Sequence, residues 1–170
     1  LGCMYAGKTS KLINIYNMMK FSNIKTCVIN YEEDKRYDNK ALCTHDKVKI
    51  PCIQTLHLMD LLKSGTINEK VIIINEGQFF PDLERFVVEM LGKDKHIYVC
   101  GLDGDFEMKK FGHILDIIPL CNEIEKLSAI CAICKNGTKA YFTKRISSEK
   151  GQKVIGSSNY LPVCRNCHKA

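Results

Sequence analysis

Two glycines, a lysine and a threonine near the start of the chain have the spacing of a phosphate-binding loop. In the run Gly2-x4-Gly7-Lys8-Thr9, the glycines let backbone N–H groups turn inward onto phosphate oxygens. Lys8 would place its charge on the β- and γ-phosphates, and the Thr9 hydroxyl would bind Mg²⁺. A glycine turn before an amphipathic helix is the alternative. We favour a nucleotide site because a helical pattern follows directly.

A carboxylate at the end of an apolar run is the second candidate for chemistry. Glu76 follows the run "VIIIN". In phosphate-loop proteins an acidic residue after a later apolar strand reaches the metal or activates the nucleophile, and ligands of open α/β sheets bind at the carboxyl ends of strands. Glu76 is therefore our candidate catalytic carboxylate, with a solvated turn glutamate as the alternative. Phe79 and Phe80 are equally compatible with core packing and with contact to a ligand.

Two Cys-x-x-Cys pairs near the C-terminus form the third candidate, and they consist of Cys131, Cys134, Cys164 and Cys167. Four thiolates paired in this way make a closed tetrahedral zinc site of the structural kind. Reduced core cysteines are the alternative. His168 is a possible substitute ligand, but the adjacent Cys167 is the better one. The residues between the pairs would form a loop tied at both ends. Such a loop is a candidate lid over a second substrate, with a plain exposed β-hairpin as its alternative.

Composition indicates what kind of ligand the protein binds and in which compartment it lies. The chain has 170 residues, a formal net charge of +6 and ten cysteines. A positive charge suits an anionic ligand such as a nucleotide or a nucleic acid, although a solvated surface explains it equally well. No apolar run approaches the length of a membrane span. A phosphate loop points to the reducing cytosol, so we expect a cytoplasmic protein with metal-bound rather than disulfide-bonded cysteines. The cysteines outside the two pairs are interpreted as inert core residues: Cys3, Cys27, Cys43, Cys52, Cys100 and Cys121.

Alternating helices and apolar strands must position these groups. The patterns predict helices over 9–21, 55–65 and 81–93, and strands over 24–30, 70–75 and 96–102. This alternation is typical of an α/β protein with a parallel sheet. A buried strand should precede a phosphate loop, so we expect the first strand upstream of Leu1. Composition changes near Leu127, which predicts an α/β domain over 1–127 and a smaller zinc-binding domain over 128–170.

Together the motifs resemble a known family. The runs "GCMYAGKT", "DKRYD", "CTHD", "NEGQFFPD", "GLDGDF", "KKFG", "KLSAICAIC", "FTKR" and "VIGSSNYLPVCRNC" are similar to the type II thymidine kinases of cells and large DNA viruses. They follow in family order over essentially the whole chain. The resemblance implies a RecA-like P-loop sheet with helices on both faces and a zinc-ribbon-like lasso domain, assembled as a homotetramer. It also implies transfer of the ATP γ-phosphate to the 5′-hydroxyl of thymidine, with inhibition by the end product dTTP.

The resemblance assigns roles to individual residues. Glu76 would be the general base, and the family usually has aspartate where Asn75 stands. ATP would be held by Gly2, Cys3, Met4, Tyr5, Ala6, Gly7, Lys8, Thr9, Ser10, Asp34, Arg36 and Gln78. Thymidine would be held by Met4, Phe79, Leu102, Phe106, Phe111, Thr143, Val154, Ile155, Gly156 and Tyr160. Mg²⁺ would be bound by Thr9 and Asp34, and structural Zn²⁺ by Cys131, Cys134, Cys164 and Cys167.

A phosphate-loop, zinc-ribbon ATPase that binds nucleic acid is the main alternative from another class. The positive charge and the cysteine pairs favour it. The sequence shows no cluster of Lys and Arg with interleaved aromatic residues, which a strand-binding groove would need. We therefore expect small-molecule substrates and neither nucleic-acid nor membrane partners. A non-catalytic zinc interaction module is a third reading, which the phosphate loop disfavours.

Overall fold

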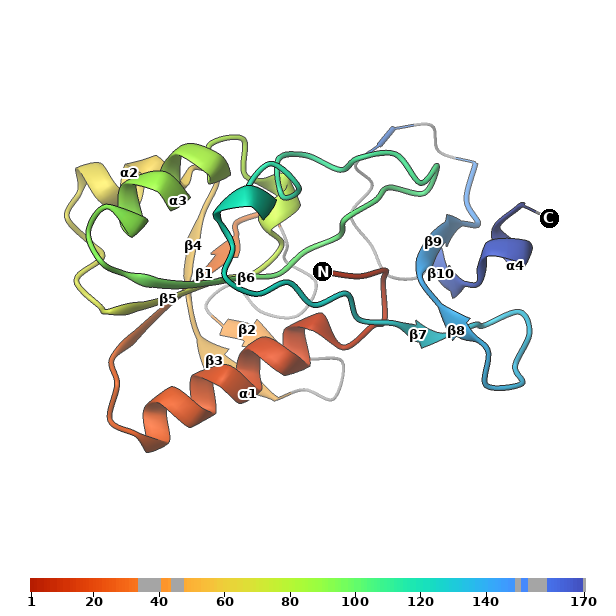
Figure 1. The fold of residues 1–170 in the computed structure, drawn as a ribbon, viewed down its shortest axis with the longest axis horizontal. Coiled ribbons are helices and arrows are strands. Elements are labelled where there is room, and N and C mark those ends of the chain that lie inside the picture. The colour runs from red at the N-terminus through yellow and green to blue at the C-terminus, as the bar shows by residue number, and fades with distance from the viewer. Residues whose placement is uncertain (34–40, 44–47, 149–150, 153–158, 170) are drawn as a thin grey trace.

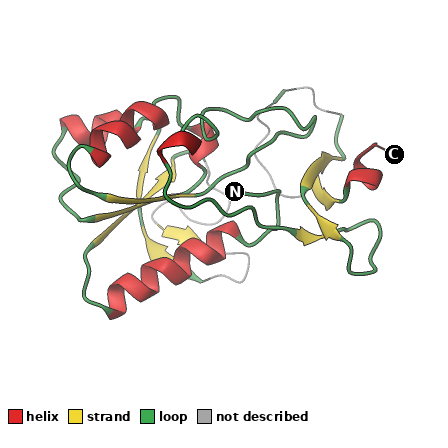
Figure 2. Cartoon of the chain, viewed as in Figure 1, coloured by secondary structure: helices red, strands yellow, loops and turns green. Residues whose placement is uncertain are grey.

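A computed structural model describes residues 1–33, 41–43, 48–148, 151–152 and 159–169. Its centre is a parallel sheet of four strands in the order β4-β1-β5-β6 (Figures 1 and 2). The strands are β1 (Thr26–Tyr31), β4 (Ile53–Thr55), β5 (Val71–Ile74) and β6 (His96–Val99). All four residues of β5 are buried, as expected of a strand covered on both faces. The predicted α/β class with a parallel sheet is confirmed.

Helices cover both faces of this sheet, with α1 on one face and α2 and α3 on the other (Figure 1). Their bounds are α1 (Lys8–Phe21), α2 (Leu58–Lys63) and α3 (Leu83–Leu91). Alternate side chains of a strand point to opposite faces, and β1 follows this rule. Cys27 and Ile29 join the core cluster that contains Leu58 and Phe86, whereas Val28 joins the cluster of α1.

Helix α2 is shorter than the predicted helix over 55–65, and this is a correction. Thr55, the first residue of the predicted helix, instead ends the edge strand β4 (Ile53–Thr55), which pairs in parallel with β1. The helix begins at Leu58 because the Asp82 carboxylate accepts hydrogen bonds from the backbone N–H groups of Leu58 at 3.2 Å and Met59 at 2.9 Å. Those N–H groups have no partner within the helix, so a carboxylate at this point determines where the helix starts.

Several short elements complete the first part of the chain. They are the hairpin of β2 (Ala41–Cys43) and β3 (Lys49–Pro51) and the 3₁₀ turns η1 (Gly77–Phe79) and η2 (Ile118–Leu120). Leu42 and Ile50 lie opposite each other in the hairpin and share a core cluster with Leu12 and Ile13 of α1. The hairpin therefore packs on the helix that carries the phosphate loop.

The C-terminal segment, by which we mean the described residues 128–148, 151–152 and 159–169, lies at the end of the molecule away from the sheet (Figure 1). It contains β7 (Ala129–Ile130), β8 (Lys139–Ala140), β9 (Phe142–Arg145), β10 (Tyr160–Val163) and α4 (Arg165–Lys169). β7 pairs antiparallel with β8, and β9 with β10. The stretch before it runs beside the start of the chain, where the Leu127 N–H donates to the Leu1 carbonyl at 2.8 Å.

A groove of about 650 Å³ runs beside β6. Within the described part of the chain, β6 has a strand neighbour, β5, on one edge. The groove is lined largely by apolar side chains, among them Leu1, Ile15, Val87, Val99, Ile114 and Ile117. The strand expected before the phosphate loop stays a prediction. None of the described helices combines the length and apolar character needed to cross a bilayer.

Candidate active site

The phosphate-binding loop leads directly into α1. Gly7 caps the N-terminus of this 14-residue helix, whose first turn carries no acidic residue. Free N–H groups and the helix dipole favour an anion at such an N-terminus. Thr9 is half-buried in the first turn, and Ser10 is exposed. An anion would therefore be stabilised at this N-terminus.

Two contacts show how the loop is held. At Gly2, where φ is 150°, a side-chain carbon would lie 2.6 Å from the Leu127 carbonyl oxygen, so only glycine fits there. The Lys8 ammonium donates a hydrogen bond to the Cys3 carbonyl at 2.7 Å. This ammonium lies against the backbone of its own loop, close to where an anion would enter.

Asn75 and then Glu76 follow β5, at the carboxyl edge of the sheet. The φ of 55° at Glu76 places it in the left-handed region, which is uncommon for a residue other than glycine and is often found at functional positions. The residue is buried to 9% exposure. Its carboxylate accepts a hydrogen bond from the Gln78 side-chain amide at 2.7 Å, and the Gln78 oxygen accepts one from the Leu102 N–H at 3.0 Å. Glu76 is thus held in one orientation.

Close packing fixes Gln78 itself. A side-chain carbon at Gly112 would lie 1.9 Å from the Gln78 carbonyl oxygen, and one at Gly101 would lie 2.2 Å from its side-chain oxygen. Any larger residue at either position would displace Gln78. The 101–112 loop therefore acts as the wall against which the Glu76–Gln78 pair rests.

Asn75 belongs to a buried chain of polar side chains. Its amide donates to the Asn30 side-chain oxygen at 2.8 Å, and its own oxygen accepts from the Cys100 thiol at 3.1 Å. Burial raises the pKa of Cys100 to about 12, with a further increase from the Glu76 carboxylate that Lys8 partly opposes. Cys100 is therefore a neutral donor, and it lies within electrostatic reach of both candidate catalytic groups.

The aromatic residues after Glu76 divide between core and site. Phe80 is 1% exposed and belongs to the main core cluster. Phe79 is partly buried and meets Phe111 edge-on, with ring centres 5.5 Å apart. Tyr31 packs on Phe79 with ring centres 5.2 Å apart. Two predicted nucleoside contacts, Phe79 and Phe111, thus share one cluster, and Tyr31 is a member that the sequence analysis missed.

The C-terminal segment contacts the phosphate loop. The Met4 N–H donates to the Thr143 hydroxyl at 3.1 Å, and the Cys3 thiol donates to the Ala140 carbonyl at 3.3 Å. Cys3 also shares an apolar cluster with Cys131. β8 and β9 therefore buttress the loop directly, which links the two ends of the chain.

The remaining predicted nucleoside contacts lie on facing segments. Leu102 and Phe106 belong to the 101–112 loop, and Tyr160 lies on β10. Five predicted site residues fall outside the described residues: Asp34, Arg36, Val154, Ile155 and Gly156. The structure therefore says nothing about their positions.

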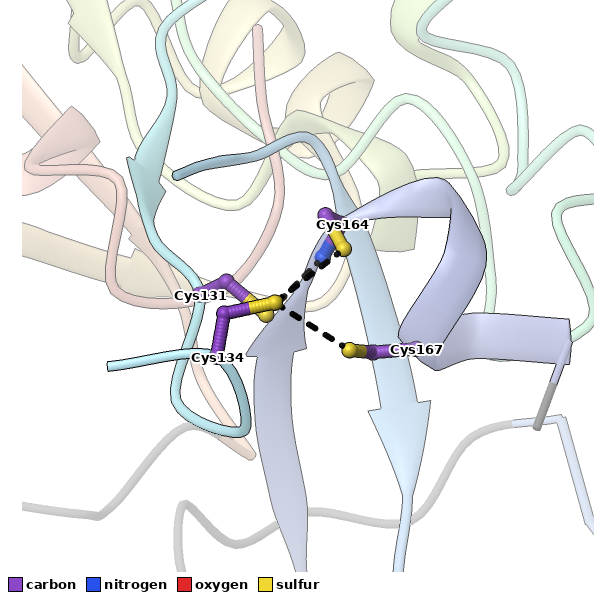
Figure 3. A group of neighbouring side chains, drawn as sticks. All are labelled: Cys131, Cys134, Cys164 and Cys167. Atoms are coloured by element: carbon purple, nitrogen blue, oxygen red, sulfur yellow. Dashed lines mark hydrogen bonds between the residues drawn. The ribbon is translucent and has the colours of Figure 1, made fainter. Parts of the chain in front are cut away.

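The four cysteines of the two pairs converge on one point (Figure 3). Their sulfur atoms all lie within 4.8 Å of one another. Cys134 is 3.7 Å from Cys164 and 3.4 Å from Cys167, sulfur to sulfur. Sulfurs around a tetrahedral zinc ion with Zn–S bonds of about 2.3 Å lie about 3.8 Å apart, so this group fits the ion. Backbone N–H groups, led by that of Cys134, lower the pKa of Cys131 to about 6 and favour its thiolate.

Cys167 joins the described sulfur group, as preferred over the neighbouring His168, whose Nε2 lies 2.9 Å from the Phe106 carbonyl. One expectation about the other cysteines is corrected. Cys121 is exposed and not a core residue.

The contacts of Asn30, Cys100 and Arg145 were also missed by sequence reasoning. The position of Asn30 at the end of a strand is the signal that could have drawn attention to it.

Comparison with known proteins agrees with this geometry. The family model described as "Thymidine kinase" matches residues 1–168. The thymidine kinase of rabbit fibroma virus (strain Kasza) is 40% identical over 170 residues, covering 99% of this chain and 93% of the relative. That of vaccinia virus (strain Western Reserve) is 38% identical over 169 residues, with coverage of 99% and 93%. Human cytosolic thymidine kinase is 37% identical over 169 residues, with coverage of 99% and 70%. The chain belongs to the thymidine kinase family.

Proposed function

We propose that this protein transfers the γ-phosphate of ATP to the 5′-hydroxyl of thymidine. The observation that carries the proposal is the family match over residues 1–168. It is joined to a buried carboxylate at the carboxyl edge of the sheet and to the glycine loop that leads into α1. Phosphoryl transfer depends chiefly on positioning and on stabilising charge. A rigid loop, one lysine and one oriented carboxylate suit that chemistry.

In this proposal Glu76 accepts the proton of the 5′-hydroxyl as its oxygen attacks the γ-phosphorus, and the bond to the ADP oxygen breaks. Gln78 keeps the Glu76 carboxylate turned toward the substrate. Lys8 exchanges its contact with the Cys3 carbonyl for the phosphates. The residues from Gly2 to Ser10, which include Met4, Tyr5 and Ala6, surround the phosphate chain with their backbone N–H groups.

Bound Mg²⁺ would neutralise charge on the phosphates during transfer. We propose that Thr9 and Asp34 hold it, with Arg36 near the phosphates. Asn75 has its side chain engaged by Asn30 and Cys100 and carries no charge, so an anionic ligand must come from elsewhere. Zn²⁺ is proposed for the four-cysteine group, where it would have a structural role.

We propose that thymidine lies between the Phe79–Phe111 pair and the C-terminal segment. Met4, Leu102, Phe106, Thr143 and Tyr160 would line its site, and backbone from Val154 to Gly156 would complete it. The end product dTTP would inhibit by occupying the same site. We further propose two domains, with the boundary after residue 127. A cytoplasmic location is also proposed, in line with the human relative, which is named cytosolic.

We also propose a homotetramer. Phe21 is 89% exposed and Met18 is 63% exposed on α1, so this helix presents apolar side chains to its surroundings. Contact with another copy would cover them. Light scattering of the purified protein measures the assembly directly.

A phosphate-transfer assay with labelled ATP and each of the four deoxynucleosides tests the proposed function. Thymidine should be the preferred acceptor, and Lys8→Met should abolish transfer without unfolding the protein. A Lys8→Met variant with normal turnover would contradict the assignment of the loop. ATP hydrolysis that DNA stimulates, without nucleoside phosphorylation, would instead favour the nucleic-acid-binding ATPase.

A further inference from the structure

Arg145 joins three segments that are far apart in the sequence. It lies on β9, and its guanidinium carbon is 3.8 Å from the centre of the Phe106 ring in the 101–112 loop. Its Nη2 donates to the Tyr160 hydroxyl on β10 at 2.7 Å and to the Gln152 carbonyl at 3.2 Å. The Tyr160 ring centre is 5.2 Å away. One side chain therefore contacts both Phe106 and Tyr160.

Two further contacts hold the same segments together. The Gln152 side-chain amide donates to the Asp105 carboxylate at 2.7 Å. Asp105 is 5% exposed, and its other oxygen accepts from the backbone N–H groups of Glu107 and Lys109, both at 2.9 Å. The turn that carries Phe106 is thus ordered by Asp105 and bound to the C-terminal segment.

A contact from α4 reaches the same turn. The His168 Nε2–H donates to the Phe106 carbonyl at 2.9 Å, and His168 directly follows Cys167 of the sulfur group. The Phe106 backbone is therefore held from α4, while the Phe106 ring is held by Arg145. Both connections start in the C-terminal segment and end on one residue of the 101–112 loop.

A guanidinium suits this role for physical reasons. It is planar, so it can stack on an aromatic ring and at the same time donate in-plane hydrogen bonds in fixed directions. A lysine ammonium is a compact point charge and cannot do both with the same geometry. The stack on Phe106 and the hydrogen bond to Tyr160 thus set the relative positions of two aromatic side chains.

We propose that Arg145 is a positioning residue that holds Phe106 and Tyr160 as two sides of the nucleoside site. The proposal rests on the proposed function, in which those two side chains contact thymidine. Loss of Arg145 should let the 101–112 loop and β10 separate. Nucleoside binding should weaken, whereas the phosphate loop, which contacts Ala140 and Thr143, should keep its affinity for ATP.

The first test is the kinetics of Arg145→Met, which keeps an unbranched chain and removes the guanidinium. The KM for thymidine should rise about 10- to 100-fold, as expected for a lost charge-assisted hydrogen bond and its stacking partner. The KM for ATP should change by less than about threefold. Arg145→Lys should restore only a small part of the affinity, since it restores charge but not planarity.

Arg165→Met is the matched control. Arg165 lies in the same segment, and its guanidinium carbon is 4.7 Å from the centre of the Phe142 ring, so the change removes the same charge and a similar stack. It should leave the KM for thymidine within about twofold. Tyr160→Phe should raise that KM in the native background and add little to Arg145→Met, because the hydrogen bond has already been lost.

Hydrogen exchange of the amides from 105 to 109, measured without substrates, tests whether Arg145 holds the 101–112 loop. This test is independent of whether the protein phosphorylates thymidine. Faster exchange in Arg145→Met, with a higher KM for thymidine, supports it. Unchanged exchange, an unchanged KM for thymidine, or an equal rise in the KM values for ATP and thymidine overturns it. If the unsubstituted protein is folded, with slow exchange of the amides from 105 to 109, but phosphorylates no thymidine, the proposed function is wrong. The positioning role then fails with it.

Discussion

At the scale of single residues, the orientation of Glu76 is the feature with the most direct chemical consequence. Its left-handed backbone turns the carboxylate off the end of β5, and Gln78 holds it there. A carboxylate held in one orientation at the end of a strand is suited to meet a substrate hydroxyl in one fixed direction. In the proposed function, both the carboxylate and its supporting amide affect the rate.

Glu76→Gln should lower kcat by about 10²- to 10⁴-fold, which is the usual contribution of a general base. The substitution keeps the shape of the side chain and removes its ability to accept a proton. Nucleotide affinity, measured by equilibrium binding of ATP, should stay close to normal. Glu89→Gln, at an exposed position of α3, provides the control. Loss of ATP binding together with activity would assign Glu76 to holding the metal.

Asn75→Asp should lower the concentration of Mg²⁺ needed for half-maximal activity, because it adds an anionic oxygen near the phosphates. The structure indicates that the change can be accommodated, since the Asn30 amide can rotate to donate to a carboxylate that replaces the Asn75 amide. Titration of activity against Mg²⁺ in both proteins measures the shift. An identical midpoint would show that residue 75 does not influence the metal.

At the scale of elements, the start of α2 depends on a residue that belongs to another helix. Asp82 precedes α3, yet its two oxygens accept the first N–H groups of α2. One carboxylate thereby joins two helices on the same face of the sheet. This contact explains why a six-residue helix, too short to be stable by itself, persists here.

Asp82→Ala should destabilise the protein by about 1–2 kcal/mol, the usual cost of losing a helix-capping side chain. Urea unfolding followed by circular dichroism measures the change. Asp60→Ala removes an exposed carboxylate that pairs with Lys63 and should cost much less, because exposed ion pairs contribute little. Equal costs for the two substitutions would refute the capping role of Asp82.

At the scale of the whole molecule, the four-cysteine group and the phosphate loop are mechanically connected. Cys131 and Cys3 pack in one apolar cluster, and Thr143 bonds to the loop backbone. The C-terminal segment also contacts Phe106 through His168. A metal bound by the four cysteines would thus influence both the phosphate loop and the 101–112 loop, where the two substrates are proposed to bind.

Removal of zinc should therefore weaken the binding of thymidine strongly and that of ATP to a smaller degree. Metal analysis of freshly reduced protein should find about one zinc per chain, as expected for four cysteine ligands. Cys134→Ser should have the same effect as chelation, whereas Cys121→Ser, at an exposed cysteine outside the group, should have none. Protein that contains no zinc and binds both substrates normally would contradict this prediction.

The sequence by itself determined the features that depend on neighbouring residues. The spacing of glycines and lysine predicted the loop and α1, the run of β-branched residues predicted β5, and paired cysteines predicted the sulfur group. Each prediction worked because a local pattern governs backbone conformation or ligand spacing over a few residues. The edge strand β4 was missed, because its three residues are too few to show the alternation of a strand.

Only the tertiary structure decided which of these features meet. The Asn30–Asn75–Cys100 chain, the capping of α2 by Asp82 and the stack of Arg145 on Phe106 join residues separated by 23 or more positions along the chain. Periodicity carries no information about such pairs, because they depend on the order of strands in the sheet and on how the C-terminal segment folds back. The sheet brings the strand ends to one edge, and that shared edge is what turns separate motifs into a site.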